Sequence, residues 1–326
     1  MAALFSPRRR GRGLLVALSL MVATLAATTA QASVVQRDLA VPSAVLGREM
    51  RASVYLPTGH ARGEQRFPVV FLLHGRGGNQ NDWLDAGRLA PLLDRLIDER
   101  AVPPMVVVMP AGEDSWYVDN PDPGGRGLWA TAFLGDLVPW VEARFAGLGR
   151  RGGRAIAGLS MGGFGALRFA FSRPDRFVAA ASLSGALFFP DEYPEHDPDR
   201  LLSAFGTPFD RARMEANNPW HLIPALAAAR ERPAIWIAAG DDDGLAFEQN
   251  AARMHAALRR AGVKSELRID QGGHDWEYWA RAIEPALRFL GGQLDHPETV
   301  PGLLTASATV EQDSRNLRIE TADTSP

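Results

Sequence analysis

Residues 155–165 read AIAGLSMGGFG, and the fold prediction for the chain begins from them. An apolar run at 154–157 leads into a turn of small residues around Ser160, and a segment able to form a helix follows at 164–171. Strand, sharp turn and helix in this order predict a nucleophile elbow, in which the glycines two before and two after the serine let strand and helix approach closely. The G-x-S-x-G pattern also arises by chance in a chain with 32 glycines, so the prediction depends on what surrounds it.

Apolar runs alternate with segments of helical periodicity from residue 67 to residue 291. Short runs such as 69–73 are typical of strands buried on both faces, whereas 248–261 has apolar residues at helical spacing. This alternation predicts an α/β fold, a mainly parallel doubly wound sheet with helices on both faces. The expected strands are 34–41, 49–56, 69–73, 105–109, 154–157, 178–183, 234–239 and 264–269, and the expected helices are 86–99, 131–145, 164–171, 248–261 and 276–290.

The first 32 residues have the pattern of an export signal. Four arginines lie between residues 8 and 12, an apolar run of about 14 residues follows, and Ala30-Gln31-Ala32 fits a cleavage site. Because the run is short for a membrane span, we expect a mature chain that begins at Ser33, has no stable membrane span and is secreted or periplasmic. An uncleaved anchor is the alternative, and the adjacent arginines allow the twin-arginine route as well as the general secretory route.

The remaining chain is expected to hold one catalytic domain, residues 33–294. Within it, residues 186–232 interrupt the alternation and are rich in proline and aromatic residues, which favours a small cap segment. The polar residues 295–326 predict a disordered tail. A net charge of only −3 gives no indication of a nucleic-acid partner, and the lack of cysteine excludes disulfides and thiolate chemistry. The sequence leaves the oligomeric state open.

A serine hydroxyl is a poor nucleophile near neutral pH, so it needs a base, and the base needs an acid to orient it. Hydrolases with this elbow carry the three groups in the chain order serine, acid, histidine. Here Ser160 follows one predicted strand, a run of three aspartates at 241–243 follows a later one, and His274 follows the last. The carboxyl ends of parallel strands meet at one edge of the sheet, so these loops should converge. We predict Ser160, Asp243 and His274 as the catalytic groups, with Asp242 as the alternative acid; a cation site is a weaker interpretation of the aspartate run.

Acyl chemistry also needs two backbone N–H groups directed at the developing oxyanion. Met161, the residue after the nucleophile, is expected to supply one of them. The other is expected from the loop HGRGG at 74–78, whose glycines let the backbone approach the substrate. We interpret His74 as a structural residue that holds this loop rather than as a base. This chemistry needs no metal or organic cofactor.

Three segments together resemble the esterase D-type esterases, a group of α/β-hydrolases: HGRGGN at 74–79, GLSMGGFGAL at 158–167 and GHDWEYW at 273–279. The group includes S-formylglutathione hydrolases, feruloyl and acetyl esterases, tributyrin esterases and mycolyltransferases. The resemblance spans residues 45–291 and implies an α/β-hydrolase fold, Asp243 as the acid and the Arg76 N–H as the second oxyanion donor. Trp116, Tyr117 and Asn120 lie where relatives have a loop near the acyl pocket, and together with Gly75 and Trp276 they are the candidate substrate contacts.

The expected function is that of a secreted serine carboxylesterase that works through an acyl-enzyme. The substrate would be a small-molecule or saccharide-linked ester; eight tryptophans suit an aromatic or sugar-linked ester, although packing of the core explains them equally well. One alternative is an acyltransferase that moves an acyl group to an alcohol or sugar, as mycolyltransferases do. Another is a catalytically idle cell-surface binding protein of the same fold. The sequence fixes neither the acyl length nor the alcohol portion.

Overall fold

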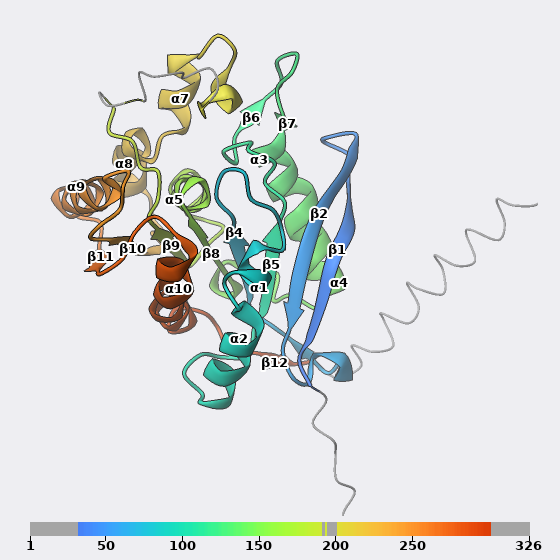
Figure 1. Ribbon diagram of the computed structural model, residues 1–326. Helices are drawn as coiled ribbons and strands as arrows, with labels where there is room; N and C mark the ends of the chain where they lie inside the picture. Colours follow the sequence, from blue (N-terminus) through green and yellow to red (C-terminus); the bar gives the residue numbers. More distant parts are fainter. Residues whose placement is uncertain (1–31, 191–192, 194–200, 301–326) are drawn as a thin grey trace, which may run out of the picture. The chain divides into compact units, whose positions relative to one another are not determined.

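An eight-stranded sheet runs through the part of the chain that the computed structural model describes, residues 32–190, 193 and 201–300 (Figure 1). Its strand order is β1-β2-β5-β4-β8-β9-β10-β11. The six strands β5, β4, β8, β9, β10 and β11 are parallel to one another, whereas β2 pairs antiparallel with both β1 and β5. The strands are β1 Val34–Ser43, β2 Arg48–Leu56, β4 Val69–Leu73, β5 Val106–Pro110, β8 Arg154–Leu159, β9 Ala179–Leu183, β10 Ala234–Gly240 and β11 Ser265–Asp270.

Helices cover both faces of this sheet, which confirms the predicted fold class. They are α1 Asp82–Asp85, α2 Leu89–Asp98, α3 Trp129–Ala132, α4 Val138–Arg144, α5 Met161–Ser172, α7 Arg211–Asn217, α8 Pro219–Ala228, α9 Phe247–Arg260 and α10 Trp276–Gly291. Short 3₁₀ turns are η1 His60–Arg62, η3 Arg151–Gly153 and η4 Ser203–Phe205.

Two predicted helices differ from those observed. The helix expected at 86–99 begins only at Leu89, because Arg88 has left-handed dihedral angles, φ 47° and ψ 40°, that a helix cannot include. The helix expected at 131–145 is instead α3, a π-helical turn at Phe133–Leu137, and α4. Pro139 lies in the first turn of α4, where its missing N–H is tolerated.

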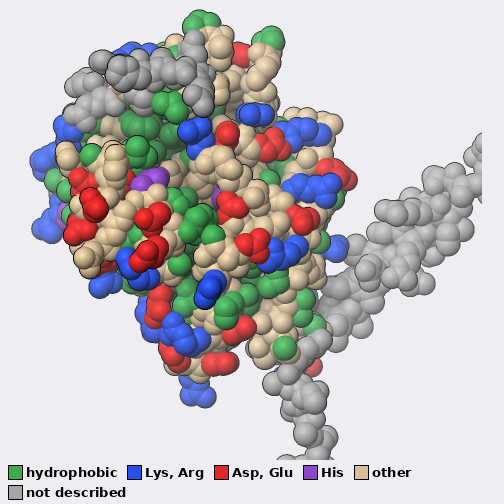
Figure 2. Space-filling view, viewed as in Figure 1, with side chains coloured by type: hydrophobic (Ala, Val, Ile, Leu, Met, Phe, Trp, Pro, Cys, Tyr) green, Lys and Arg blue, Asp and Glu red, His purple; other side chains and the backbone are tan. Residues whose placement is uncertain are grey.

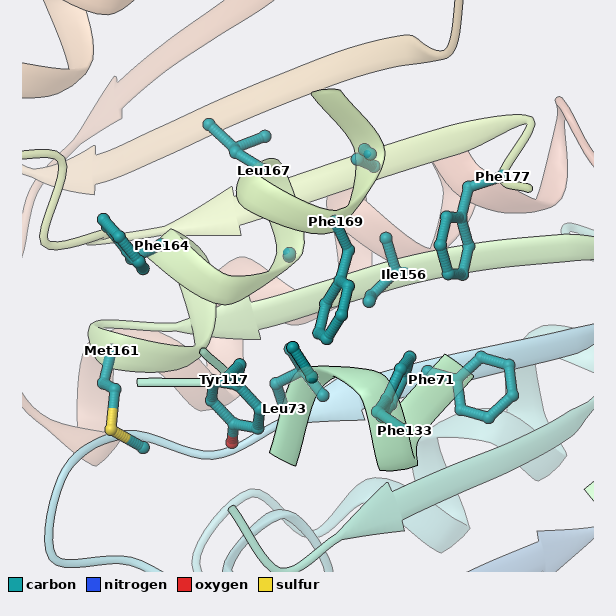
Figure 3. Close-up of a cluster of buried hydrophobic side chains, with 14 of the residues drawn as sticks. Phe71, Leu73, Tyr117, Phe133, Ile156, Met161, Phe164, Leu167, Phe169 and Phe177 are labelled. Atoms are coloured by element: carbon teal, nitrogen blue, oxygen red, sulfur yellow. The ribbon is translucent and has the colours of Figure 1, made fainter. Parts of the chain in front are cut away.

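The central strands are buried on both faces, as their continuous apolar sequences predict. In β4 all five residues are buried, and alternate residues belong to two separate hydrophobic clusters. Phe71 and Leu73 belong to the cluster that includes residues of α4, α5, α8 and α9, part of which Figure 3 shows. Val70 and Leu72 belong to the cluster with residues of α1, α2 and α10. The sheet is therefore fixed from both sides, which gives its carboxyl edge a rigid support.

Between β9 and β10 the chain forms η4, α7 and α8, within the segment expected to be a cap. Arg213 of α7 pairs with Asp122 at 2.6 Å and donates to Asn120 Oδ1 at 2.8 Å. Both partners belong to the hairpin region of β6, Asp119–Asn120, and β7, Gly127–Leu128, and Figure 1 shows α7 beside this hairpin. Residues 191–192 and 194–200 lie outside the described residues, so a cap over the site stays a prediction.

The polar C-terminal segment does not become disordered at residue 295, contrary to the prediction. Strand β12, Glu298–Thr299, pairs antiparallel with β3, Gln65–Arg66. Arg150 forms ion pairs with Asp295 at 2.7 Å and with Glu298 at 2.5 Å. Pairing over two residues leaves no periodicity in a sequence, which is why the pattern did not indicate it.

Two other predictions fall on residues that the structure does not describe. Residues 1–31 contain nearly all of the expected signal peptide, and residues 301–326 contain most of the expected tail. Within the described ranges, no helix has the length and apolarity needed to cross a membrane.

Candidate active site

Ser160 occupies a sharp turn between β8 and α5. Its dihedral angles, φ 52° and ψ −118°, are unfavourable for a residue with a side chain. The glycines on either side have no space for a Cβ: one at Gly158 would lie 2.5 Å from the backbone of Gly162, and one at Gly162 would lie 2.6 Å from the carbonyl oxygens of Leu73 and His74. The strand, turn and helix expected from the sequence are therefore present, and they direct the serine away from the sheet.

Ser160, His274 and Asp243 form a continuous hydrogen-bonded series at the carboxyl edge of the sheet. His274 Nε2 lies 3.1 Å from Ser160 Oγ, and His274 Nδ1 lies 2.8 Å from Asp243 Oδ2. Because an ionised carboxylate only accepts hydrogen bonds, Nδ1 carries the proton and Nε2 is left as the acceptor for the serine hydroxyl. This arrangement can draw a proton from the hydroxyl and stabilise the imidazolium that results.

The three consecutive aspartates occupy different environments. The side chain of Asp243 has no exposed surface, whereas Asp241 and Asp242 are exposed. Asp241 Oδ1 accepts the Gly272 N–H at 3.0 Å and so holds the loop that carries His274. A buried carboxylate needs a partner, and His274 is that partner for Asp243. The geometry favours Asp243 over Asp242 as the acid.

On the face of the molecule shown in Figure 2, exposed histidine side chains lie among acidic and hydrophobic side chains. Among the described residues, no group of three or more histidine, aspartate or glutamate side chains is arranged to hold a metal ion.

Two aromatic rings fix the imidazole from its sides. Phe247, the first residue of α9, lies edge-to-face with His274 at a centroid distance of 5.3 Å, and Trp279 of α10 does so at 4.9 Å. Such contacts favour one ring orientation over others. The sequence analysis did not assign this role to either residue; the available signal was that each lies in the first turn of a helix that follows a predicted catalytic loop.

The loop after β4 places Gly75, the residue before Arg76, beside Ser160. A Cβ at Gly75 would lie 3.4 Å from Ser160 Cβ and 2.7 Å from the side chain of Leu159. Within the described part of the chain, neither the Arg76 N–H nor the Met161 N–H donates to a hydrogen-bond acceptor. An oxyanion hole requires backbone N–H groups that have no other acceptor, and these two meet that condition.

His74 is buried beneath this loop and is bound on three sides. The Gly112 N–H donates to Nε2 at 2.6 Å, Nδ1 lies 2.7 Å from the Gly75 carbonyl oxygen, and the Tyr117 hydroxyl donates to the His74 carbonyl oxygen at 2.9 Å. Burial lowers the pKa of His74 below its ordinary value. These contacts agree with the interpretation of His74 as a residue that holds the loop.

Two of the candidate substrate contacts are buried structural residues, contrary to the prediction. Tyr117 has no exposed surface and lies within the hydrophobic cluster (Figure 3), with its hydroxyl already bonded below the loop. Asn120 is 2% exposed; its amide donates to the Ser203 carbonyl and accepts from Arg213. Their burial results from segments distant in sequence, which local pattern does not reveal.

Trp116 and Trp276 differ in how much they can reach a substrate. Trp116 is 5% exposed, donates from Nε1 to the Leu201 carbonyl at 3.2 Å and packs against Phe164 and Phe205, so it mainly supports the cap segment. Trp276 is partly exposed at the start of α10 and packs edge-to-face on Trp83. Gly75 and Trp276 thus stay candidates for substrate contact.

A mainly parallel sheet with a nucleophile elbow and with serine, acid and histidine in that order defines the α/β-hydrolase class. The solved structure of a ferulic acid esterase aligns with a TM-score of 0.69 and 28% identity, covering 81% of this chain and 99% of that structure. The family model described as "Putative esterase" matches residues 43–290. The chain therefore belongs to this esterase family, as the resemblance in its sequence predicted.

Curated relatives include both an esterase and an acyltransferase. Esterase MT1326 of Mycobacterium tuberculosis is 29% identical over 253 residues, which cover 71% of this chain and 54% of that protein. The diacylglycerol acyltransferase/mycolyltransferase Ag85B of Mycobacterium avium is 28% identical over 292 residues, covering 78% of this chain and 82% of that protein. The chain thus spans about half the length of the first of these relatives.

Proposed function

We propose that this protein is an exported serine carboxylesterase. The observation that carries the proposal is the hydrogen-bonded series from Ser160 Oγ through the His274 ring to Asp243. The two unused backbone donors and the membership of an esterase family support the same reaction. The proposal is also supported by the chain order of Ser160, Asp243 and His274 and by their position at one edge of the sheet.

The reaction would proceed through an acyl-enzyme. Ser160 Oγ attacks the acyl carbon while His274 Nε2 takes its proton, and the Arg76 and Met161 N–H groups bind the oxyanion. The tetrahedral intermediate collapses, the ester C–O bond breaks, and His274 returns the proton to the leaving alcohol. Water then attacks the acyl-enzyme by the same route and releases the acid. Asp243 keeps Nδ1 protonated and stabilises the imidazolium in both halves.

The test is hydrolysis of p-nitrophenyl esters with acyl chains of two to sixteen carbons. We expect Ser160→Ala to lower kcat by about 10⁴-fold or more, because the nucleophile is lost. Ser172→Ala is the matched control, since Ser172 is exposed at the other end of α5 and its hydroxyl only bonds to the Phe169 carbonyl. A wild-type protein without turnover on any chain length would rule out the hydrolase and favour an idle binding protein.

Acyl transfer is the second candidate, and the similarity to the mycolyltransferase of Mycobacterium avium favours it. The same acyl-enzyme serves both reactions, so the acceptor that attacks it decides between them. Adding a sugar or glycerol to the ester assay separates the two. Transfer predicts an acylated acceptor by mass spectrometry and faster release of p-nitrophenol, whereas hydrolysis predicts free acid and an unchanged rate.

Export is supported by the N-terminal pattern of arginines, apolar run and Ala30-Gln31-Ala32. We expect expression of the whole chain to yield a mature protein outside the cytoplasm whose N-terminal residue is Ser33. N-terminal sequencing of the exported fraction measures this directly. An uncleaved chain in the membrane fraction would favour the anchor instead.

A further inference from the structure

His74 is a buried histidine of the proposed site that takes no direct part in the proposed reaction. It follows β4 immediately, is 1% exposed, and both of its ring nitrogens have backbone partners. The loop that contains Gly112 contacts the His74 ring from one side, and the loop that follows β4 contacts the ring from the other. A histidine bound in this way has only one protonation state that satisfies both partners.

The two hydrogen bonds determine where the ring proton is. The Gly112 N–H is a donor, so Nε2, at 2.6 Å from it, must be the unprotonated acceptor. The Gly75 carbonyl oxygen is an acceptor, so Nδ1, at 2.7 Å from it, must carry the proton. An imidazolium would bring a second N–H against the Gly112 N–H. The environment therefore selects the neutral ring with its proton on Nδ1.

The Gly75 carbonyl accepts from His74 Nδ1 at 2.7 Å and also from the Gly78 N–H at 3.1 Å, and it belongs to the same peptide unit as the Arg76 N–H. A trans peptide is planar, and its C=O and N–H point in opposite directions. Holding the Gly75 oxygen on the side of His74 therefore directs the Arg76 N–H to the other side. A hydrogen bond to the carbonyl also polarises the amide, which strengthens the N–H as a donor.

We propose that His74, as the neutral Nδ1-protonated tautomer, is a positioning residue that orients the Arg76 N–H of the oxyanion hole through the Gly75 carbonyl. This role rests on the proposed ester chemistry, in which that N–H binds the oxyanion. His74 itself touches no reacting atom.

Neighbouring groups keep this arrangement in place. The Tyr117 hydroxyl holds the His74 carbonyl, and Asp114 accepts the Gly77 N–H at 2.5 Å, so the peptide units on both sides of the Gly75–Arg76 unit are also fixed. The charged groups that face His74 are Asp82 of α1 and Asp114 of the loop after β5, and both raise its pKa. Burial outweighs them and lowers the pKa, which favours the neutral ring.

The first test does not depend on activity. The whole protein, labelled with ¹⁵N-histidine, contains seven histidines, and the His74 signals are identified by their absence in His74→Gln. We expect ¹⁵N–¹H spectra between about pH 5.5 and 8 to show a protonated Nδ1 and an unprotonated Nε2, as for any buried neutral histidine with these partners. A proton on Nε2, or an imidazolium at neutral pH, would overturn the proposal.

The second test uses two amide replacements of His74. An Asn amide nitrogen lies near the position of Nδ1 and keeps the donor to Gly75, whereas a Gln amide group lies near Nε2 and leaves that donor missing. We expect His74→Gln to lower kcat with little change in KM, by between about tenfold and the 10²–10³-fold that complete loss of one oxyanion donor causes. His74→Asn should retain more of kcat than His74→Gln.

A control variant and an inhibitor affinity distinguish a positioning role of His74 from a general loss of structure. His60→Gln replaces a half-buried histidine that bonds to the Phe145 carbonyl at 3.1 Å near the start of β4, at the opposite edge of the sheet, and should leave kcat unchanged. A trifluoromethyl ketone, which forms a tetrahedral oxyanion on the serine, should bind His74→Gln more weakly by the same factor as the loss in kcat. Equal losses in the Asn and Gln variants, or unchanged inhibitor affinity, would contradict the proposal. Inactivity of the wild type would refute the esterase function, and the tautomer measurement would still stand on its own.

Discussion

Backbone hydrogen bonds to neighbouring segments stabilise the unfavourable dihedral angles of Ser160; its own side chain does not. Its N–H donates to the Leu183 carbonyl at 2.9 Å, and its carbonyl accepts from Phe164 at 3.0 Å and from Ala186 at 3.1 Å. A residue in a sparsely populated region persists only where the surroundings determine it in this way. The hydroxyl is thereby free to face His274, and the strain is supported by both the sheet and the helix.

At the same scale, the aspartate run provides a direct test of the acid. In Asp243→Asn the amide can donate to Nδ1, which favours the tautomer with its proton on Nε2 and removes the base for Ser160. We expect kcat for p-nitrophenyl acetate to fall by about 10⁴-fold. Asp242→Asn is the matched control: its side chain is exposed, and we expect kcat within about twofold of wild type because exposed charges have small effects. Equal activity of the two variants would mean that Asp243 is not the acid.

The residues that could be predicted are those fixed by local pattern and chain order. Ser160 lies in a turn whose glycines have a steric cause, and His274 lies on a glycine-flanked loop after the last strand. Tyr117 and Asn120 were misjudged because their burial depends on His74 and on the cap segment, which are distant in the chain. Burial of a loop side chain is a property of the packed fold, so no local pattern carries it.

At the scale of the element, the irregular helix between β7 and β8 contains a position that can be improved. Gly135 lies in the π-helical turn, is exposed, and a Cβ there would meet nothing within 4 Å. Because glycine loses more backbone entropy on folding than alanine, we expect Gly135→Ala to raise the free energy of unfolding by about 0.5–1 kcal/mol. Urea denaturation measures this change.

Gly165→Ala is the matched opposite case in α5. There a Cβ would lie 2.5 Å from the ring of Tyr117, so the same substitution overpacks the core and should cost about 1–3 kcal/mol. If both variants shifted stability in the same direction, intrinsic helix propensity rather than space would decide the outcome at these positions.

Helices and strands with one regular apolar pattern were predicted well. Segments that join different kinds of helix were not. Strand β4 was placed residue for residue because an uninterrupted apolar run has one interpretation in a covered parallel sheet. The segment 131–145 has the periodicity of one helix, yet it forms α3, a π-helical turn at Phe133–Leu137 and α4. A π-helical turn differs from an α-helical one in its hydrogen bonds, i→i+5 in place of i→i+4, and an apolar pattern does not indicate that difference.

At the scale of the whole molecule, the proposed site lies at the carboxyl edge of the sheet and not in the hollow at the opposite edge. A hollow of about 530 Å³ lies where β10 and β11 begin, lined by Ala234, Lys264 and Ser265 among others. The strands run parallel, so this is the edge opposite to Ser160 and His274. The carboxyl ends of the strands could be predicted as the active edge from topology alone. The contacts of the cap segment with the β6–β7 hairpin could not, because they join segments about 90 residues apart.

Stability of the whole fold should depend on histidine protonation. Burial is the largest cause of a lowered pKa for His60, His74 and His255. In the unfolded chain these groups titrate near their ordinary value of about 6.5, so below that pH the unfolded state binds more protons than the folded state. The stability that depends on their neutral forms is therefore fully present above about pH 6.5 and is lost as the pH falls toward the folded pKa values.

We expect the free energy of unfolding in urea to fall between about pH 7.5 and pH 5. Carboxylates with lowered pKa values, such as Asp122 and Glu284, lose their contribution only below about pH 4.5, so the two effects separate along the pH axis. His60→Gln should reduce the slope in the upper range, since one titrating group is gone, and should leave the lower range as it is. A free energy that stayed level from pH 7.5 to pH 5, or the same slope in His60→Gln, would show that these histidines titrate alike in the folded and unfolded chains.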